Sequence, residues 1–366
     1  MSKIVVSGYY GSKNAGDEAM LAAMIEVLSD LDPQLNITAI SADPGDTRQR
    51  HGIEAVPLLD FPSIVRALRS ADLLLSGGGS LLQNVTSRRS LYYYLGIISL
   101  AHLVGCPVML YAQGIGPIDG KLARRFMNWV GNRVDLITVR DRGSLDELSS
   151  LGIHRPPIEC TADPVLGIHP VGREEGRRIL RQFHADGAKP MVGISVREWR
   201  GWRHYKEVLA QTVDAVVREL DARVVFLPMQ YPEDVHAAQS VAALAEESCT
   251  VLPEEYRTSE LLSLVGNMDL MLGIRLHALI FAGVMGVPMV GISYDPKIGR
   301  FLSSIGEASA GDLGSITSEE LMAEIRRRWN DRSAFRDRNA KLMVQLRDLA
   351  ARNAELALGL MKSKNS

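Results

Sequence analysis

Short apolar runs alternate with helical patterns along most of this chain, and this alternation limits the fold more than any other feature. The runs are rich in leucine and β-branched residues, and they are too uniformly apolar for antiparallel strands with one exposed face. Such runs are typical of buried parallel strands joined by crossover helices. The sequence therefore predicts an α/β protein built from Rossmann-like, doubly wound sheets.

The elements of the first half follow this pattern up to an irregular segment. Strands are predicted near Lys3–Ser7, Asn36–Ser41, Asp72–Ser76, Pro107–Ala112 and Asp135–Val139. Helices are predicted at Gly16–Leu31, Pro62–Arg69, Arg89–Val104, Lys121–Asn132 and Gly143–Leu151. The segment Ile158–Gly172 contains prolines and glycines that no good helix crosses, so it is the candidate domain junction.

The pattern restarts after this junction. Strands are predicted near Met191–Val196, Ala222–Leu227, Asp269–Leu272 and Pro288–Ser293, with helices near Tyr205–Leu220, Pro232–Glu246, Ser259–Val265 and Leu276–Met285. From Ser318 the chain is charged and helical, with a break near Asp331–Ser333. We expect an N-terminal domain of residues 1–165, a C-terminal domain of residues 170–333, and a helix of residues 334–366 that returns over the N-terminal domain. The two domains are expected to face a cleft at the carboxyl ends of their strands.

Length and composition are those of an ordinary globular protein. The 366 residues correspond to two domains at about 150 residues each. With 41 basic and 43 acidic residues, the chain has no bulk charge for binding nucleic acid. Three distant cysteines, no secretory-type apolar segment at the start and no zinc-type histidine pair lead us to expect a cytoplasmic protein without a metal.

Three glycine-containing loops follow predicted strands of the first half. The first loop, from Gly8, contains Asn14, Gly16, Asp17 and Glu18 at the start of a helix; it matches neither a dinucleotide-binding motif nor a P-loop. Its acids can bind a ligand or simply cap the helix. The second loop, Ser76–Ser80, includes Gly78 and Gly79, whose bare backbone suits a sugar or an anion or is a plain glycine turn. The third loop, at Ala112–Gly120, presents Gln113, a neutral side chain suited to polyol recognition.

Cationic residues follow the strands of both halves. Arg275 and His277 stand at the start of an otherwise apolar helix, where free N–H groups already favour an anion. A lone histidine in such a helix is more often a core residue, but the adjacent arginine favours an anion site. Arg140, Arg197 and Lys297 also follow strands, although Arg140 can equally pair with a neighbouring acid.

These motifs together resemble the polysaccharide pyruvyl transferase family, nearest to its bacterial cell-surface-anchoring type. The resemblance is carried by GSKNAGDEAML, SGGGSLL, QGIGP, VRDRGS, SVREW and GIRLHALIFA, and covers about residues 3–305. It implies a fold similar to the GT-B glycosyltransferases and transfer of pyruvate from phosphoenolpyruvate to a sugar as a ketal, with release of phosphate. The implied acceptor is N-acetylmannosamine of a polyprenyl-diphosphate-linked disaccharide, a precursor of the secondary cell wall polymer that retains S-layer proteins.

The resemblance also implies roles for individual residues. Phosphoenolpyruvate is a co-substrate and no cofactor is implied. The donor site would comprise Arg275, Leu276, Arg197, Arg140 and Lys297. His277 would act as the general acid, and Asp17 or Glu18 would accept the hydroxyl proton or hold the sugar. The acceptor would be bound by Asn14, Gly16, Gly78, Gly79 and Gln113.

A lipid-linked acceptor predicts peripheral contact with the inner face of the membrane. The basic segments Arg326–Arg328 and Arg332–Arg338 are candidates for that contact, or are ordinary solvated helix faces. Two alternative functions fit the same sequence. One is a GT-B nucleotide-sugar enzyme, either a glycosyltransferase or a 2-epimerase, and the other is a non-catalytic sensor of a glycan or metabolite.

Overall fold

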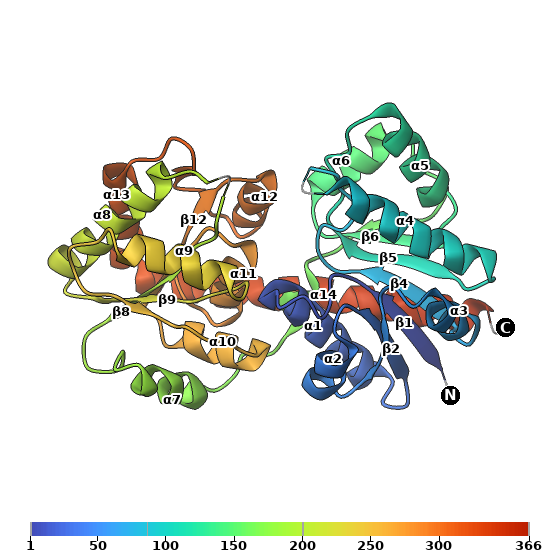
Figure 1. Cartoon of the computed structure of the whole chain (residues 1–366), viewed down its shortest axis with the longest axis horizontal. Helices are drawn as coiled ribbons and strands as arrows, with labels where there is room; N and C mark the ends of the chain where they lie inside the picture. The colour runs from blue at the N-terminus through green and yellow to red at the C-terminus, as the bar shows by residue number, and fades with distance from the viewer. Residues whose placement is uncertain (1, 86, 200, 365–366) are drawn as a thin grey trace. The chain divides into compact units, whose positions relative to one another are not determined.

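The computed structural model describes residues 2–85, 87–199 and 201–364, and it divides into two compact units (Figure 1). Unit 1 comprises residues 1–168 and 345–366, and unit 2 comprises residues 169–344. Each unit contains its own parallel sheet. The predicted fold class, two doubly wound α/β domains, is confirmed.

The sheet of unit 1 has the order β3-β2-β1-β4-β5-β6-β7, and all its neighbouring strands pair in parallel. Its strands are β1 (Lys3–Ser7), β2 (Asn36–Ser41), β3 (Glu54–Pro57), β4 (Leu73–Gly77), β5 (Val108–Gln113), β6 (Leu136–Val139) and β7 (Ile158–Cys160). The chain order reverses between β1 and β4. That reversal makes the carboxyl ends of these two strands the position where open α/β sheets bind ligands.

Helices cover both faces of the unit 1 sheet. They are α1 (Ala15–Leu31), α2 (Pro44–His51), α3 (Phe61–Arg69), α4 (Arg88–Leu103), α5 (Lys121–Gly131) and α6 (Arg142–Ser150). One hydrophobic core joins the sheet to α3, α4, α5 and α6, and the core on the other face joins it to α1 and the end of the C-terminal helix. Buried strands with apolar residues on both faces explain the uniform runs in the sequence.

The sheet of unit 2 repeats this strand order, as β10-β9-β8-β11-β12-β13. Its strands are β8 (Met191–Ser195), β9 (Arg223–Phe226), β10 (Thr250–Val251), β11 (Leu270–Gly273), β12 (Met289–Ser293) and β13 (Gly311–Asp312). The helices of this unit are α7 (Glu174–Gln182), α8 (His204–Leu220), α9 (Glu233–Ala242), α10 (Thr258–Gly266), α11 (Leu276–Val284), α12 (Pro296–Ser304) and α13 (Ser318–Asn330). The order here reverses between β8 and β11.

The last helix, α14 (Arg332–Lys364), follows α13 after a break at Asp331, inside the predicted interval. Its second part belongs to unit 1, where Ala354, Ala357 and Met361 enter the core beside α1. Asn353 fixes it there, because its Oδ1 accepts a hydrogen bond from the Thr161 hydroxyl at 2.8 Å. The expected return of the C-terminal helix to the N-terminal domain is therefore observed.

The division between the units, after Ile168, falls inside the predicted junction segment of residues 158–172. The sequence did not predict the short strand at the start of this segment, where Ile158–Cys160 form β7 at the edge of the unit 1 sheet. A 3₁₀ turn at Pro164–Gly167 follows, capped by Asp163, whose carboxylate accepts from the backbone N–H of Val165. The prolines exclude an α-helix but leave room for a short edge strand before them.

Candidate active site

Four loops of unit 2 meet at the carboxyl edge of its sheet. They follow β8, β9, β11 and β12, which are neighbours in the order β9-β8-β11-β12. The loops after β8, β11 and β12 carry Arg197, Arg275 and Tyr294, and the loop after β9 leads to Asp234 in the first turn of α9. Residues from four distant parts of the sequence therefore lie around the reversal between β8 and β11.

Tyr294 is the centre of this cluster. Arg197 Nη1 donates a hydrogen bond to its hydroxyl oxygen at 2.5 Å, and the guanidinium lies 4.5 Å from the tyrosine ring centroid. Trp199 completes the arrangement, because its ring lies 4.7 Å from the Tyr294 ring and 4.9 Å from the Arg197 guanidinium. Two aromatic faces thus hold the arginine in place.

Three cations act electrostatically on Tyr294. Burial opposes ionisation of its hydroxyl, but Lys297, Arg197 and Arg275 outweigh that effect and lower the pKa of Tyr294 below its ordinary value. The Lys297 ammonium lies 5.5 Å from the ring centroid. A tyrosine pKa shifted in this direction reports a local positive potential, which is the condition for binding an anion.

A buried carboxylate fixes Arg275. Asp234 is fully buried and accepts from Arg275 Nη2 at 2.5 Å and Nε at 3.0 Å, while Arg275 stays 16% exposed. The Asp234 carboxylate also accepts from the backbone N–H groups of Met229 and Gln230. These bonds orient the guanidinium without enclosing it, so it can still contact a ligand.

His277 lies in the first turn of α11, two residues after Arg275. The strand before this helix, β11, ends at Gly273, where a Cβ would lie only 2.7 Å from the Leu279 side chain of the helix. Arg275 is the N-cap residue, Leu276 is buried in the first turn, and the Nε2 atom of His277 is buried. The predicted group Arg275, Leu276 and His277 therefore occupies one helix start.

Two buried polar atoms at the carboxyl edge of the unit 2 sheet have no hydrogen-bond partner among the described residues. They are Arg197 Nε and Ser195 Oγ. Buried polar atoms normally find partners, so an unpaired cationic N–H is informative. Together with the local potential, it favours an anionic ligand on unit 2.

In unit 1 the loop after β1 is held by its own side chains. Asn14 is the N-cap of α1 and accepts from the backbone N–H groups of Gly16 and Asp17 at 3.0 and 3.2 Å. Glu18 accepts from Gly11 N–H at 2.8 Å and pairs with His51 at 2.7 Å. The side-chain cap is therefore Asn14, rather than the acids Asp17 and Glu18 that the sequence suggested, and Glu18 serves to anchor the loop.

The glycine loop after β4 packs against α1. Gly78 and Gly79 have φ values of +77° and +79°, which favour glycine. A Cβ on Gly79 would lie 3.2 Å from the Asp17 carboxylate, so Asp17 sits beside this loop. Gln113 is fully buried and donates from Nε2 to the Ser76 carbonyl at 2.9 Å, which ties β5 to the loop.

Arg140 is engaged entirely within unit 1. Its Nη1 pairs with Asp163 at 2.6 Å, with side-chain exposures of 6% and 5%, and its Nη2 donates to Ser80 Oγ at 2.9 Å. The neighbouring acid that the sequence left open is Asp163, 23 residues away. These bonds hold the glycine loop to the end of β6, while the cations around Tyr294 all belong to unit 2.

Sequence reasoning missed Tyr294 and Asp234 as site residues. Tyr294 directly follows β12, and Asp234 lies in the first turn of α9. Position after a strand was an available signal for Tyr294, but the pairing of Asp234 with Arg275 depends on the strand order.

Among the described residues, no group of three His, Cys, Asp or Glu side chains could hold a metal ion. No helix in the described ranges is long and apolar enough to span a bilayer.

Comparisons with known proteins agree with this architecture. The UDP-bound MnaA of S. aureus shares 13% identity over 97% of this chain and 94% of that one, with a TM-score of 0.66. UDP-GlcNAc 2-epimerase of Neisseria meningitidis shares 10% identity over 99% of this chain and 100% of that one, also with a TM-score of 0.66. The E. coli ADP-heptose LPS heptosyltransferase II shares 16% identity over 91% and 100%, at 0.52.

The fold therefore defines a two-domain α/β protein of the GT-B type, with a cationic cluster at the strand ends of unit 2. Residues 14–296 match the family model described as polysaccharide pyruvyl transferase, and the chain belongs to that family. The amylovoran biosynthesis protein AmsJ of Erwinia amylovora is 20% identical over 275 residues, which are 70% of this chain. The match spans 65% of the length of that relative.

Proposed function

We propose that this protein transfers the pyruvyl group of phosphoenolpyruvate to two hydroxyl groups of a sugar, which forms a ketal and releases phosphate. The observation that carries the proposal is the cluster of Arg197, Arg275 and Lys297 around Tyr294. Phosphoenolpyruvate bears a carboxylate and a phosphate, so its site needs several fixed cations. The family match supports the reaction class.

His277 is the proposed general acid. Protonation of the methylene carbon by the imidazolium gives an oxocarbenium-like centre, which one sugar hydroxyl attacks. The C–O bond to phosphate then breaks, and the second hydroxyl closes the ketal. The two sugar hydroxyls release two protons. One replaces the proton that His277 gives to the methylene carbon, and the other is carried away by the phosphate.

The acceptor sugar is assigned to unit 1. Its strand ends carry neutral groups and backbone at Asn14, Gly16, Gly78 and Gly79, with Asp17 beside the glycines. Gln113, which the sequence placed among the acceptor-binding residues, is fully buried and supports the glycine loop through the Ser76 carbonyl. Neutral hydrogen-bonding groups suit a polyol better than they suit a trianion. Asp17 is preferred to Glu18 as the group that receives a hydroxyl proton, because its carboxylate lies beside the glycine loop, whereas Glu18 holds the loop after β1 through Gly11 and His51.

The specific acceptor proposed is the N-acetylmannosamine residue of a polyprenyl-diphosphate-linked disaccharide, in assembly of a secondary cell wall polymer that anchors an S-layer. This assignment rests on the motif resemblance alone. The name of the relative AmsJ, an amylovoran biosynthesis protein, suggests a sugar intermediate of that kind of biosynthesis as the competing acceptor. Both acceptors are built on the cytoplasmic face of a membrane under this proposal.

The test measures phosphate release from phosphoenolpyruvate with each acceptor, together with the ketal methyl signal of the product by NMR. Acceptor-dependent release with a new methyl signal supports the proposal. Release of nucleotide from a UDP-sugar, without consumption of phosphoenolpyruvate, would instead support the nucleotide-sugar alternative, a class of enzyme that shares this fold. Donor binding with no turnover on any acceptor would support a sensor.

A further inference from the structure

We propose that the outer face of α4 and α5 in unit 1, together with Arg133 just beyond α5, docks on an anionic lipid surface. We call this the α4–α5 face, and its residues are Arg88, Arg89, Tyr92, Leu103, Lys121, Leu122, Arg125, Phe126, Trp129 and Arg133. The inference deepens the proposed function, on which it rests for the lipid-linked acceptor.

Large apolar side chains are exposed along this face. Leu103 is 80% exposed, Leu122 78%, Trp129 46% and Tyr92 44%. The rings of Tyr92 and Phe126 stack with centroids 6.2 Å apart, and Phe126 and Trp129 stack at the same distance. A continuous aromatic ridge therefore crosses from α4 to α5 at the surface of the unit.

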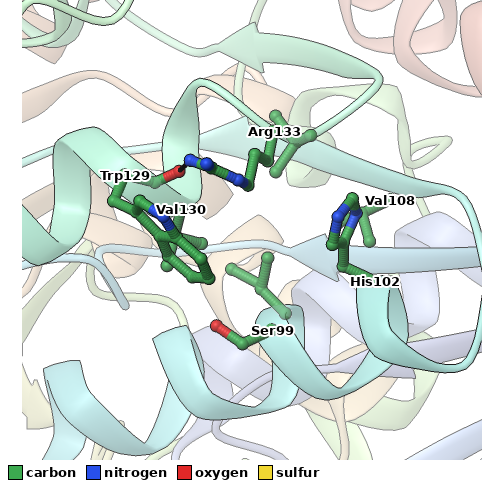
Figure 2. A pocket seen from close by; sticks show the side chains of 8 residues that line it. Ser99, His102, Val108, Trp129, Val130 and Arg133 are labelled. Atoms are coloured by element: carbon green, nitrogen blue, oxygen red, sulfur yellow. Dashed lines mark hydrogen bonds between the residues drawn. The ribbon is translucent and has the colours of Figure 1, made fainter.

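The ridge borders a hollow between the two helices. Figure 2 shows Trp129 and Arg133 facing Ser99 and His102 across it. Its volume is about 10 Å³, close to that of one water molecule. The hollow is too small to bind a substrate. We therefore assign the exposed side chains around it to contact with a surface outside the protein. Arg133 lies over the Trp129 ring at 4.3 Å, and this places a cation at the edge of the aromatic ridge.

The charges of this face have one sign. Residues 88–103 and 121–133 contain arginines and a lysine but no aspartate or glutamate. Arg124 pairs with Glu147 of α6, whereas no ion pair within the described residues involves Arg88, Arg89, Lys121 or Arg125. Aromatic and leucine side chains flanked by basic ones are the composition of interfacial helices that bind anionic lipid.

Most arginines in the basic segments expected from the sequence to touch the membrane are paired with acids. The exceptions within the described residues are exposed Arg336 and Arg332, whose guanidinium lies 3.9 Å from the Trp329 ring centroid. Arg326 pairs with Glu219 at 2.8 Å, Arg327 with Glu324 at 2.5 Å, and Arg338 with Asp331 at 2.5 Å. Arg328 is buried against Glu307 and Glu324. Because acids offset four of these arginines, the two segments attract an anionic surface less than the α4–α5 face does.

The position of the face in unit 1 suits a lipid-linked sugar. Arg88 and Lys121 begin the helices that follow the loops after β4 and β5, which are the proposed acceptor loops. Asn84 and Asp119 clip these loops together, since the Asn84 side chain donates to the Asp119 carbonyl and accepts from the Asp119 N–H at 2.7 and 2.9 Å. The basic ends of α4 and α5 therefore lie at the same sheet edge as Gly78 and Gly79.

The experiment measures cosedimentation of the full-length protein with vesicles, without any substrate. The vesicles are phosphatidylcholine alone or equimolar phosphatidylcholine and phosphatidylglycerol. Each basic residue near such a surface contributes about a fivefold gain in affinity. The triple variant R88Q/R89Q/R125Q should therefore bind anionic vesicles roughly 100-fold more weakly. The variant L122Q/W129Q tests the apolar contribution and should also release the protein from vesicles.

The matched control is R326Q/R327Q/R338Q, which removes the same charge from the paired arginines and should leave vesicle binding within about twofold. Absence of wild-type binding to anionic vesicles, or equal binding by the α4–α5 variants, would overturn the inference. Self-association abolished by L122Q/W129Q, with no vesicle binding, would assign the face to a second copy and would also overturn it.

Failure of the proposed reaction can be distinguished from failure of the proposed docking surface. The α4–α5 variants should keep wild-type turnover on a water-soluble acceptor and lose it only on a vesicle-borne acceptor. Vesicle binding with the expected variant pattern but no consumption of phosphoenolpyruvate would contradict the proposed reaction while it supports the docking surface.

Discussion

The two units share a strand order and differ in the chemistry at their strand ends. In unit 1, Ser7, Ser76 and Gln113 are buried polar residues at the ends of β1, β4 and β5, and none carries a charge. In unit 2, the equivalent edge carries Arg197 and Arg275 with Lys297 beside them. The same topology therefore supplies two ligand positions, and the charges decide which of them suits an anion.

The arginine–aspartate pairs show this difference most clearly. Each unit has a post-strand arginine paired with a buried aspartate, Arg140 with Asp163 and Arg275 with Asp234. The guanidinium of Arg140 is nearly enclosed and its second donor bonds Ser80, whereas that of Arg275 is partly exposed and contributes to the potential at Tyr294. One pair stabilises a loop, and the other presents a cation.

The largest expected effect concerns His277, the proposed acid on unit 2. His277→Ala should lower kcat by at least about 100-fold, because general acid catalysis contributes that much. Donor affinity, measured by calorimetry with phosphoenolpyruvate, should be largely retained, since the cations remain. Exposed His236 on α9 provides a matched control, and His236→Gln should leave kcat unchanged. An unaltered kcat in His277→Ala would remove this residue from the mechanism.

The next test separates the two arginine pairs. Arg275→Gln should weaken donor binding by about 2 kcal/mol, roughly 30-fold, because it removes a charged contact. Arg140→Gln should instead lower the free energy of unfolding by about 3 kcal/mol, because buried Asp163 loses its cation. Calorimetry and urea unfolding measure both quantities.

If Arg275→Gln and Arg140→Gln changed donor affinity and stability in the same way, the two arginine–aspartate pairs would not differ in role. A large loss of donor affinity in Arg140→Gln, with unchanged stability, would return Arg140 to the donor site that the sequence motifs suggested. Asp234→Asn is the companion variant. It leaves the fork of Arg275 without its carboxylate partner and should weaken donor binding less than Arg275→Gln does.

The sequence predicts the sheets well because strands that are buried on both faces are continuous apolar runs in the sequence. The bounds of β1 and β2 match the predicted runs, and β4 and β5 differ from them by one residue at each end. Helix α2 was missed because its sequence, PGDTRQRH, is polar throughout; its signals were the N-cap Asp43 followed by Pro44, and Gly52 at the end. Strands β7, β10 and β13, of two or three residues, are too short to give a pattern.

The candidate site was only partly predictable for a different reason. Arg275 and His277 stand out because a cation at a helix start is a local feature of the sequence. The partnership of Tyr294 with Arg197 spans 97 residues and that of Asp234 with Arg275 spans 41. The first pair requires β8 and β12 to flank β11, and the second requires β9 and β11 to flank β8. The spacing of residues along the sequence does not reveal this strand order.

A smaller effect is expected at the acceptor edge of unit 1. Gly79→Ala places a Cβ 3.1 Å from the Met20 methyl and 3.2 Å from the Asp17 carboxylate, at a φ of +79°. The left-handed backbone costs about 1–2 kcal/mol for a residue with a side chain. We expect a lower melting temperature and a several-fold higher KM for the sugar, with donor affinity unchanged. Gly96→Ala, in a helix with open space around its Cβ, is the control. A change confined to donor affinity would contradict the division of ligands between the units.

The smallest effect is expected at the Tyr294 hydroxyl and depends on pH. Lys297, Arg197 and Arg275 lower the pKa of Tyr294 against the opposing effect of burial, so its phenolate forms at less alkaline pH than an ordinary tyrosine. The phenolate would add a negative charge among the donor-binding cations, and the KM for phosphoenolpyruvate should therefore rise as pH increases through this pKa. Tyr294→Phe should abolish that rise while it costs about 1 kcal/mol of donor affinity at neutral pH, through loss of the bond from Arg197. The KM measured across neutral to alkaline pH in both proteins decides the matter, because an identical alkaline rise in Tyr294→Phe would show that another group titrates and that Tyr294 is not at the donor site.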